Sequence, residues 1–202
     1  KTKFYFASSS ELFGNVKTSP QNEETKFNPR SAYGVSKVAG FYLTKNYREA
    51  YKLFACSGIL FNHESPRRNV NFVSRKITKN LSLIIKGKIK KIILGNINSK
   101  RDWGHAKDYV YAMWKILQLK RPQDFVIGTG KVHSVREFLH LAFKRVNLDY
   151  KRYIKIDKKL FRPNDNIILK ANFNKAKRIL NWKPKISFKS LVNEMVDYDL
   201  NN

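Results

Sequence analysis

The continuous apolar run at residues 53–61 (LFACSGILF) constrains the fold of this chain more than any other feature. A short apolar run without alternation is typical of a strand in a parallel sheet that is covered on both faces. Helical apolar periods lie before and after it, at residues 33–51 and 72–86. Strands that alternate with helices predict an α/β fold with a mostly parallel sheet.

The other expected elements continue this alternation. A short buried strand is expected at residues 3–7, and Ser31 can cap the helix at 33–51. Ser134 and Glu137 form a capping box for a helix that ends near residue 146. The remaining expected segments are strands at 92–94 and 125–127, helices at 106–119, 174–180 and 187–200, and loops at 62–71 and 99–104.

The formal net charge is +26, which would suit a nucleic-acid-binding protein. However, the Lys and Arg residues are spread along the whole chain, and Asn is also abundant. This pattern favours compositional drift of the coding sequence, so we expect no nucleic-acid partner and only incidental affinity for polyanions. No apolar run approaches the roughly 20 residues that span a bilayer, so no membrane contact is expected. The single cysteine, Cys56, is expected in the core, and a lone cysteine fits the cytoplasm.

Tyr33 and Lys37 are the first candidates for chemistry. Side chains four residues apart lie one above the other on a helix, where an ammonium favours the phenolate form of a tyrosine and makes it a usable base. The pair alone is a weak signal, because most such spacings are ordinary helix surface. Ser9 and Glu11 lie upstream at an expected strand end. A hydroxyl and a carboxylate there would complete a site that oxidises an alcohol and moves a second proton.

Several ordered motifs then narrow the interpretation. They lie at residues 7–14 (ASSSELFG), 29–37 (PRSAYGVSK), 62–68 (NHESPRR), 71–76 (NFVSRK), 100–110 (KRDWGHAKDYV), 132–138 (VHSVREF) and 180–184 (LNWKP). Together they resemble the extended short-chain dehydrogenases/reductases that act on nucleotide sugars, and among these the GDP-mannose 4,6-dehydratase family. The resemblance covers nearly the whole chain. It implies one domain over residues 1–202: a partial Rossmann-type parallel sheet with a small C-terminal α/β substrate-binding lobe, mainly at 64–104 and 147–202.

The resemblance implies a redox-neutral loss of water from GDP-mannose with tightly held NADP, a step toward GDP-fucose and other deoxyhexoses. Tyr33 would accept the proton of the C4 hydroxyl, and Ser9 would hydrogen-bond the C4 oxygen. Lys37 would hold the nicotinamide ribose. Glu11 would take the C5 proton and help to expel the C6 hydroxyl, a step that distinguishes a dehydratase from a C4 epimerase.

Further positions match the family's binding residues. The resemblance places His63 and Arg68 at the cofactor, and no metal is expected. The positions matched to the sugar nucleotide are Asn62, Asn71, Lys76, Arg101 and Arg162. It also implies a homo-oligomer, either a dimer or a tetramer.

The glycine-rich turn of a dinucleotide-binding sheet is missing from the sequence, which contains no G-x-x-G-x-x-G. We therefore expect the chain to be the later part of a longer enzyme, with a complementing N-terminal half as a possible partner. Two alternatives remain open at this point. The chain could be another nucleotide-sugar epimerase or dehydratase, or a non-catalytic remnant that binds polyanions or another subunit.

Structural roles are expected for several other residues. Trp103 and Trp182 are interpreted as packing residues. Arg75 is expected on the solvated surface, and Asp102 is expected to neutralise neighbouring Arg and Lys side chains.

Overall fold

The computed structural model describes residues 2–161 and 167–202, and the chain divides into two compact units. The sheet unit comprises Lys1–His63, Asp102–Val132 and Leu169–Lys185. The helical unit comprises Glu64–Arg101, His133–Ile168 and Ile186–Asn202. The lobe expected at 147–202 is thus divided between the units, because residues 174–180 pack on the sheet.

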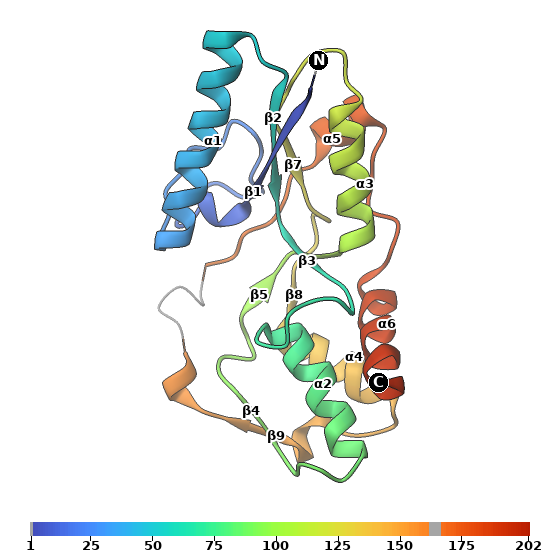
Figure 1. The fold of residues 1–202 in the computed structure, drawn as a ribbon. Coiled ribbons are helices and arrows are strands. Elements are labelled where there is room, and N and C mark those ends of the chain that lie inside the picture. Colours follow the sequence, from blue (N-terminus) through green and yellow to red (C-terminus); the bar gives the residue numbers. More distant parts are fainter. Residues whose placement is uncertain (1, 162–166) are drawn as a thin grey trace. The chain divides into compact units, whose positions relative to one another are not determined.

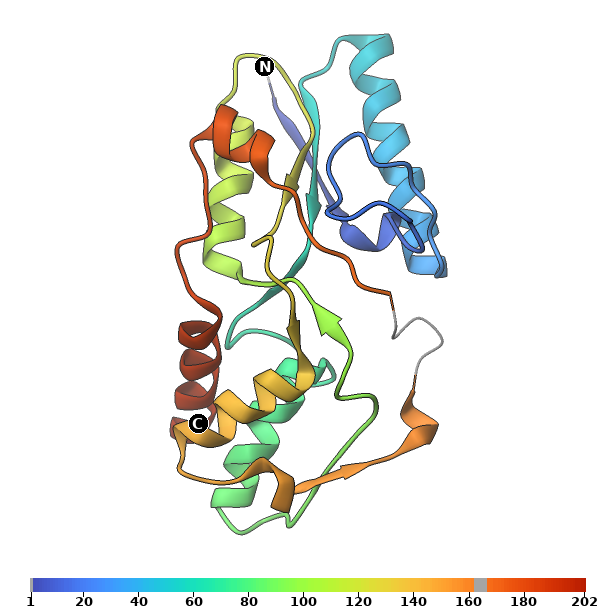
Figure 2. The same cartoon turned by 180° about the vertical axis from the view of Figure 1, so that it is seen from behind.

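A three-stranded parallel sheet forms the centre of the sheet unit (Figures 1 and 2). Its strand order is β1 (Phe4–Ser9), β2 (Ala55–Leu60) and β7 (Phe125–Ile127). Helix α1 (Ala32–Tyr51) covers one face, and α3 (Ala106–Leu117) covers the other, where α5 (Asn174–Leu180) packs against β7. The predicted α/β fold with a parallel sheet is confirmed.

Strand β2 is buried along its whole length, as its apolar run predicts. Cys56 and Leu60 pack with residues of α3 and α5, whereas Ile59 packs on the opposite side with Phe41 of α1. Burial raises the pKa of the Cys56 thiol to about 11, as expected for a core cysteine. The interpretation of Trp182 and Trp103 as packing residues is also confirmed, since both are almost completely buried.

Strand β1 is less buried than expected. It lies at the edge of the described sheet, and Phe4 is 53% exposed. The prediction of a buried strand at 3–7 is therefore wrong in its burial, although the strand itself is present. Only β2 pairs with β1 among the described residues, so the outer side of β1 has no neighbouring strand to extend the core.

The helical unit is built on the mutual packing of α2 (Val73–Ile85), α4 (Val135–Arg145) and α6 (Phe188–Asn201). Its strand pairs are β4 (Ile92–Leu94) with β9 (Ile154–Ile156), and β5 (Lys100–Arg101) with β8 (His133–Ser134). The expected helices are confirmed in both units to within about two residues at most ends, and both expected caps form. The Oγ atoms of Ser31 and Ser134 accept hydrogen bonds from the backbone N–H groups of Gly34 and Glu137.

The segments expected as loops contain short strands that the sequence pattern does not reveal. Strand β3 (Asn62–Glu64) pairs with β6 (Trp103–His105). Runs of two or three residues are too short to show a strand period. Within the described residues, none of the helices is long and apolar enough to cross a membrane.

Two charged residues have other roles than expected. Arg75 is buried in an ion pair with Asp199, so its assignment to the solvated surface is wrong. Asp102 is 1% exposed, and its partners among the described residues carry no charge. It accepts hydrogen bonds from the backbone N–H of Thr129, Gly130 and Ala171, and from the Thr129 hydroxyl.

The Asp102 carboxylate therefore ties together two segments that are far apart in the sequence. Burial raises the pKa of this carboxyl group, and the hydrogen bonds from Thr129, Ala171 and Gly130 oppose that shift. The described donors are neutral, and their hydrogen bonds satisfy the buried charge.

We predict that Asp102→Asn lowers the free energy of unfolding by about 2–4 kcal/mol, because the new NH₂ group would face donors that need an acceptor. Urea unfolding followed by circular dichroism measures this loss. Asp149→Asn is the matched control: Asp149 is exposed and caps a short helix by accepting from Lys151 N–H, which asparagine also does. A stability of Asp102→Asn equal to that of the control would contradict the assigned role.

Candidate active site

The carboxyl ends of the three parallel strands meet at one edge of the sheet. Ser9 is aligned with Leu60 and Leu60 with Ile127, so the strands end level with one another. The segments that follow them, which carry Glu11 and His63, therefore leave the sheet at the same edge. In open α/β sheets this edge is where ligands bind.

Ser9 and Glu11 are placed by a short helix, η1 (Ser10–Leu12), directly after β1. The Ser9 Oγ accepts a hydrogen bond from the Glu11 backbone N–H at 3.2 Å. Leu12 and Phe13 are fully buried beneath this turn, whereas Glu11 is exposed. The buried pair anchors the turn and leaves the carboxylate accessible to a ligand.

Tyr33 and Lys37 lie on the first turns of α1, as their spacing predicts. Tyr33 is 54% exposed. The Lys37 Nζ donates a hydrogen bond to the Ala7 carbonyl at 2.8 Å and lies 5.4 Å from the centroid of the Tyr33 ring. The ammonium thus links the helix to strand β1, next to the tyrosine.

Gly34 brings the start of α1 close to η1. A Cβ at this position would lie 2.8 Å from the Glu11 carbonyl oxygen and 3.1 Å from the Pro29 Cβ. This contact sets the distance between the backbone that carries Glu11 and the backbone that carries Tyr33. Sequence reasoning missed Gly34, although a glycine inside a helix costs about 1 kcal/mol relative to alanine and therefore points to a packing reason.

His63 and Asn62 follow β2 at the same edge. The His63 Nδ1 lies 2.9 Å from the Phe61 carbonyl oxygen, and its ring stacks on Tyr109 with centroids 4.9 Å apart. Asn62 and His63 are both half-buried. The sheet unit therefore brings together six of the predicted site residues: Ser9, Glu11, Tyr33, Lys37, Asn62 and His63.

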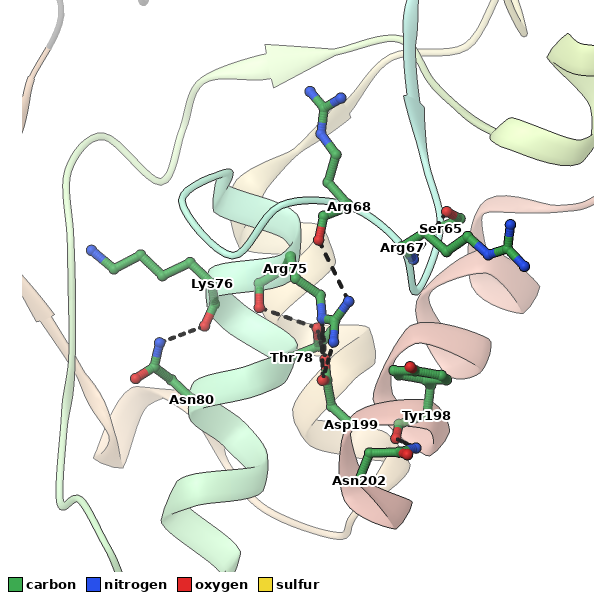
Figure 3. Close-up of polar contacts among 10 residues, drawn as sticks. All are labelled: Ser65, Arg67, Arg68, Arg75, Lys76, Thr78, Asn80, Tyr198, Asp199 and Asn202. Carbon is green, nitrogen blue, oxygen red and sulfur yellow. Dashed lines mark hydrogen bonds and ion pairs between the residues drawn. The ribbon is translucent and has the colours of Figure 1, made fainter.

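The helical unit carries four others: Arg68, Asn71, Lys76 and Arg101. The Arg68 Nε lies 3.2 Å from a Glu64 carboxylate oxygen, and its guanidinium lies 3.5 Å from the centroid of the Phe72 ring. Asn71 is exposed, and Lys76 lies in the first turns of α2 (Figure 3). Arg162 lies outside the described residues. No group of three or more His, Cys, Asp or Glu side chains that could hold a metal is found in the described part of the chain.

A cavity of about 500 Å³ in the sheet unit does not coincide with these residues. It lies at the amino end of β7, beside Arg48 and Asp124, which form an ion pair at 2.7 Å. Asp124 also accepts from the Ser57 backbone N–H, and Arg48 donates to the Ala55 carbonyl. These charges hold α1 to β2 and β7, so we assign them a structural role.

The fold and this arrangement define a class: a Rossmann-type α/β protein with the Tyr-x-x-x-Lys helix of the short-chain dehydrogenases/reductases. The family model described as GDP-mannose 4,6 dehydratase matches residues 1–195, and the chain belongs to this family.

Curated relatives agree with this assignment. The chain is 50% identical to GDP-mannose 4,6 dehydratase of Dictyostelium discoideum, over 99% of this chain and 61% of that protein. It is 54% identical to GDP-mannose 4,6 dehydratase 1 of Arabidopsis thaliana, over 98% of this chain and 55% of that protein. The human GDP-mannose 4,6 dehydratase is 48% identical, over 98% of this chain and 58% of that protein. The chain thus spans little more than half the length of these relatives.

Solved structures share the fold at lower identity. RMD from Pseudomonas aeruginosa, complexed with NADPH, has a TM-score of 0.89 at 20% identity, covering 99% of this chain and 67% of that one. The dTDP-glucose 4,6-dehydratase of Bacillus anthracis, in complex with NAD, has a TM-score of 0.85 at 22% identity, covering 99% and 62%.

We predict that Gly34→Ala destabilises the chain by about 1–3 kcal/mol, because the methyl group forces α1 away from the Glu11 backbone. Helix propensity alone predicts that the variant gains about 1 kcal/mol of stability. The sign of the change in unfolding free energy therefore shows whether the close approach of α1 to η1 matters. Urea unfolding measures it. The control is Ser36→Ala on the same helix, an exposed position where we expect a change within about 0.5 kcal/mol. A stabilised Gly34→Ala variant would show that the close approach is unimportant.

Proposed function

We propose that this chain carries the catalytic residues of a GDP-mannose 4,6-dehydratase, a lyase that converts GDP-mannose to GDP-4-keto-6-deoxymannose and water. One observation carries the proposal. Ser9, Glu11, Tyr33 and Lys37 lie on two adjoining segments at the carboxyl edge of the sheet, in a chain that belongs to this family. The curated relatives supply the substrate by name.

The first half of the reaction needs a base at the C4 hydroxyl. Tyr33 is exposed on α1 and accepts that proton, while the Ser9 hydroxyl hydrogen-bonds the C4 oxygen. The Lys37 ammonium lies beside this tyrosine, 5.4 Å from the centroid of its ring.

The residues present also fit a nicotinamide cofactor. An ammonium has three donors, and Lys37 gives one of them to the Ala7 carbonyl, which leaves donors for ribose hydroxyls. A bound nicotinamide supplies the hydride acceptor for C4 and the hydride donor for C6. We propose NADP, because one structural neighbour is described with NADPH. His63 and Arg68 are the proposed contacts from the segment after β2.

The second half of the reaction removes water across C5 and C6. Oxidation at C4 acidifies the C5–H bond, and Glu11 takes that proton and returns one to the departing C6 hydroxyl. The departing water carries that proton away, and C5 takes a new proton from Tyr33 when the hydride returns to C6. The exposed carboxylate on η1 suits this exchange, since the water must leave the site.

Binding of the sugar nucleotide is proposed for Asn62, Asn71, Lys76, Arg101 and Arg162. Arginine pairs bidentately with phosphate oxygens, and the net charge of +26 attracts an anionic substrate. We further propose that the chain acts in the cytoplasm within a homo-oligomer, as the family resemblance and the single cysteine support.

The test combines turnover and cofactor reduction for the chain with GDP-mannose and NADP, with a complementing N-terminal half present. We expect Glu11→Gln to lower formation of the 4-keto-6-deoxy product by a factor of about 10³, which is typical for loss of an acid–base group. C4 oxidation should survive, so the reduced cofactor accumulates and its absorbance rises.

Glu24→Gln serves as the control, because Glu24 is an exposed carboxylate of the sheet unit outside the site. An unchanged product rate in Glu11→Gln would overturn the dehydratase role. A folded wild-type chain that binds neither GDP-mannose nor NADP with the N-terminal half present would overturn the proposal as a whole.

A further inference from the structure

Arg75 is a buried cation of the helical unit. It lies on the first turn of α2, and only 9% of it is exposed. Its Nε and Nη2 donate to the carboxylate of Asp199 on α6 at 2.8–3.1 Å. Asp199 is 0% exposed and also accepts from the Thr78 hydroxyl at 2.6 Å (Figure 3). Both charges are thus removed from water and paired.

A third contact joins this pair to the preceding loop. The Arg75 Nη1 donates to the backbone carbonyl of Arg68 at 3.4 Å. The loop between Glu64 and α2 carries Arg68 and Asn71, and Lys76 directly follows Arg75 on the helix. One guanidinium therefore connects α6, α2 and the loop that carries the cationic and amide side chains.

A second buried carboxylate, that of Glu64, binds Ser74, the residue before Arg75 on the same turn of α2. Glu64 accepts from the Ser74 hydroxyl at 2.6 Å. The N-cap residue of α2 is Phe72, which makes no side-chain capping bond. The start of α2 is thus fixed by two carboxylates from outside the helix and not by an ordinary cap.

The energetics favour a positioning role over a simple stabilising one. Burying an ion pair costs nearly as much solvation energy as the pair returns, and apolar residues of similar size would hold two helices together as well. An ion pair with several directed hydrogen bonds permits only one relative placement of the segments it joins. Here those segments include the turn of α2 that carries Lys76.

We propose that Asp199 is a positioning residue: acting through Arg75, it fixes the 65–72 loop and the first turn of α2, so that Asn71 and Lys76 are held ready for the diphosphate of the sugar nucleotide. This inference rests on the proposed function for the identity of the ligand. The hold on the loop is a property of the chain alone and can be measured without any ligand.

The test compares Asp199→Asn with Asp197→Asn. Asp197 lies two residues earlier on α6 and pairs with Arg145 at the surface, so it controls for loss of an Arg–Asp pair on the same helix. We expect amide hydrogen exchange in residues 65–76 to accelerate at least tenfold in Asp199→Asn and to stay unchanged in Asp197→Asn. We also expect the dissociation constant for GDP-mannose, measured by calorimetry, to rise about tenfold in Asp199→Asn alone.

A double-mutant cycle with Lys76→Ala separates positioning from general stability. If Asp199 acts through Lys76, its substitution weakens binding much less in the Lys76→Ala background. Fully additive losses in both the Lys76→Ala and the Asn71→Ala backgrounds would overturn the proposal, as would unchanged exchange in residues 65–76.

Milder variants cover the case in which Asp199→Asn does not fold. Arg75→Lys keeps the charge but loses the fork that reaches both Asp199 and Arg68, and Thr78→Val removes one bond to Asp199. The same exchange and binding changes, of smaller size, are expected from both, and their absence would overturn the proposal. A wild-type chain that binds no GDP-mannose with the N-terminal half present would instead overturn the proposed function, while the exchange comparison still decides whether Asp199 holds the loop.

Discussion

The burial of β2 on both faces is the constraint on which the sheet unit depends. Its residues face α1 on one side and α3 with α5 on the other, and each fully buried aliphatic side chain contributes about 1.5–3 kcal/mol. Parallel pairing of β2 with both β1 and β7 then aligns the three carboxyl ends. The candidate catalytic residues lie at that edge because the chain can leave a doubly covered parallel sheet only at the strand ends.

Acidic residues have an unusual importance in this chain, which has 15 of them against 41 Lys and Arg. Asp102, Asp124 and Asp199 are each placed where segments distant in the sequence meet, and each accepts several hydrogen bonds. A basic chain can leave most of its cations in water. Its few buried carboxylates collect backbone and side-chain donors that would otherwise lack acceptors, and removing any of them would leave buried donors unsatisfied.

Much of the fold was predictable from periodicity, and much of the candidate site from motif order. The apolar run ending at Phe61 and the capping residues Ser31 and Ser134 identified the main elements close to their observed ends. The two- and three-residue strands were not predictable, because they have no pattern long enough to detect. The grouping of Ser9 and Glu11 with Tyr33 was expected from sequence. The close approach of Gly34 to the Glu11 backbone, which sets the separation of these segments, was not. The roles of these residues stay predictions.

The sequence by itself determined the fold class, the family and the identity of the candidate residues, because those depend on local spacing and on ordered motifs. Only the tertiary structure decided which charges are buried. Arg75 and Asp102 look like surface residues in the sequence, yet the structure places each against partners more than 25 residues away. Burial and long-range hydrogen bonding depend on which segments meet in space, and no local pattern around either residue encodes that meeting.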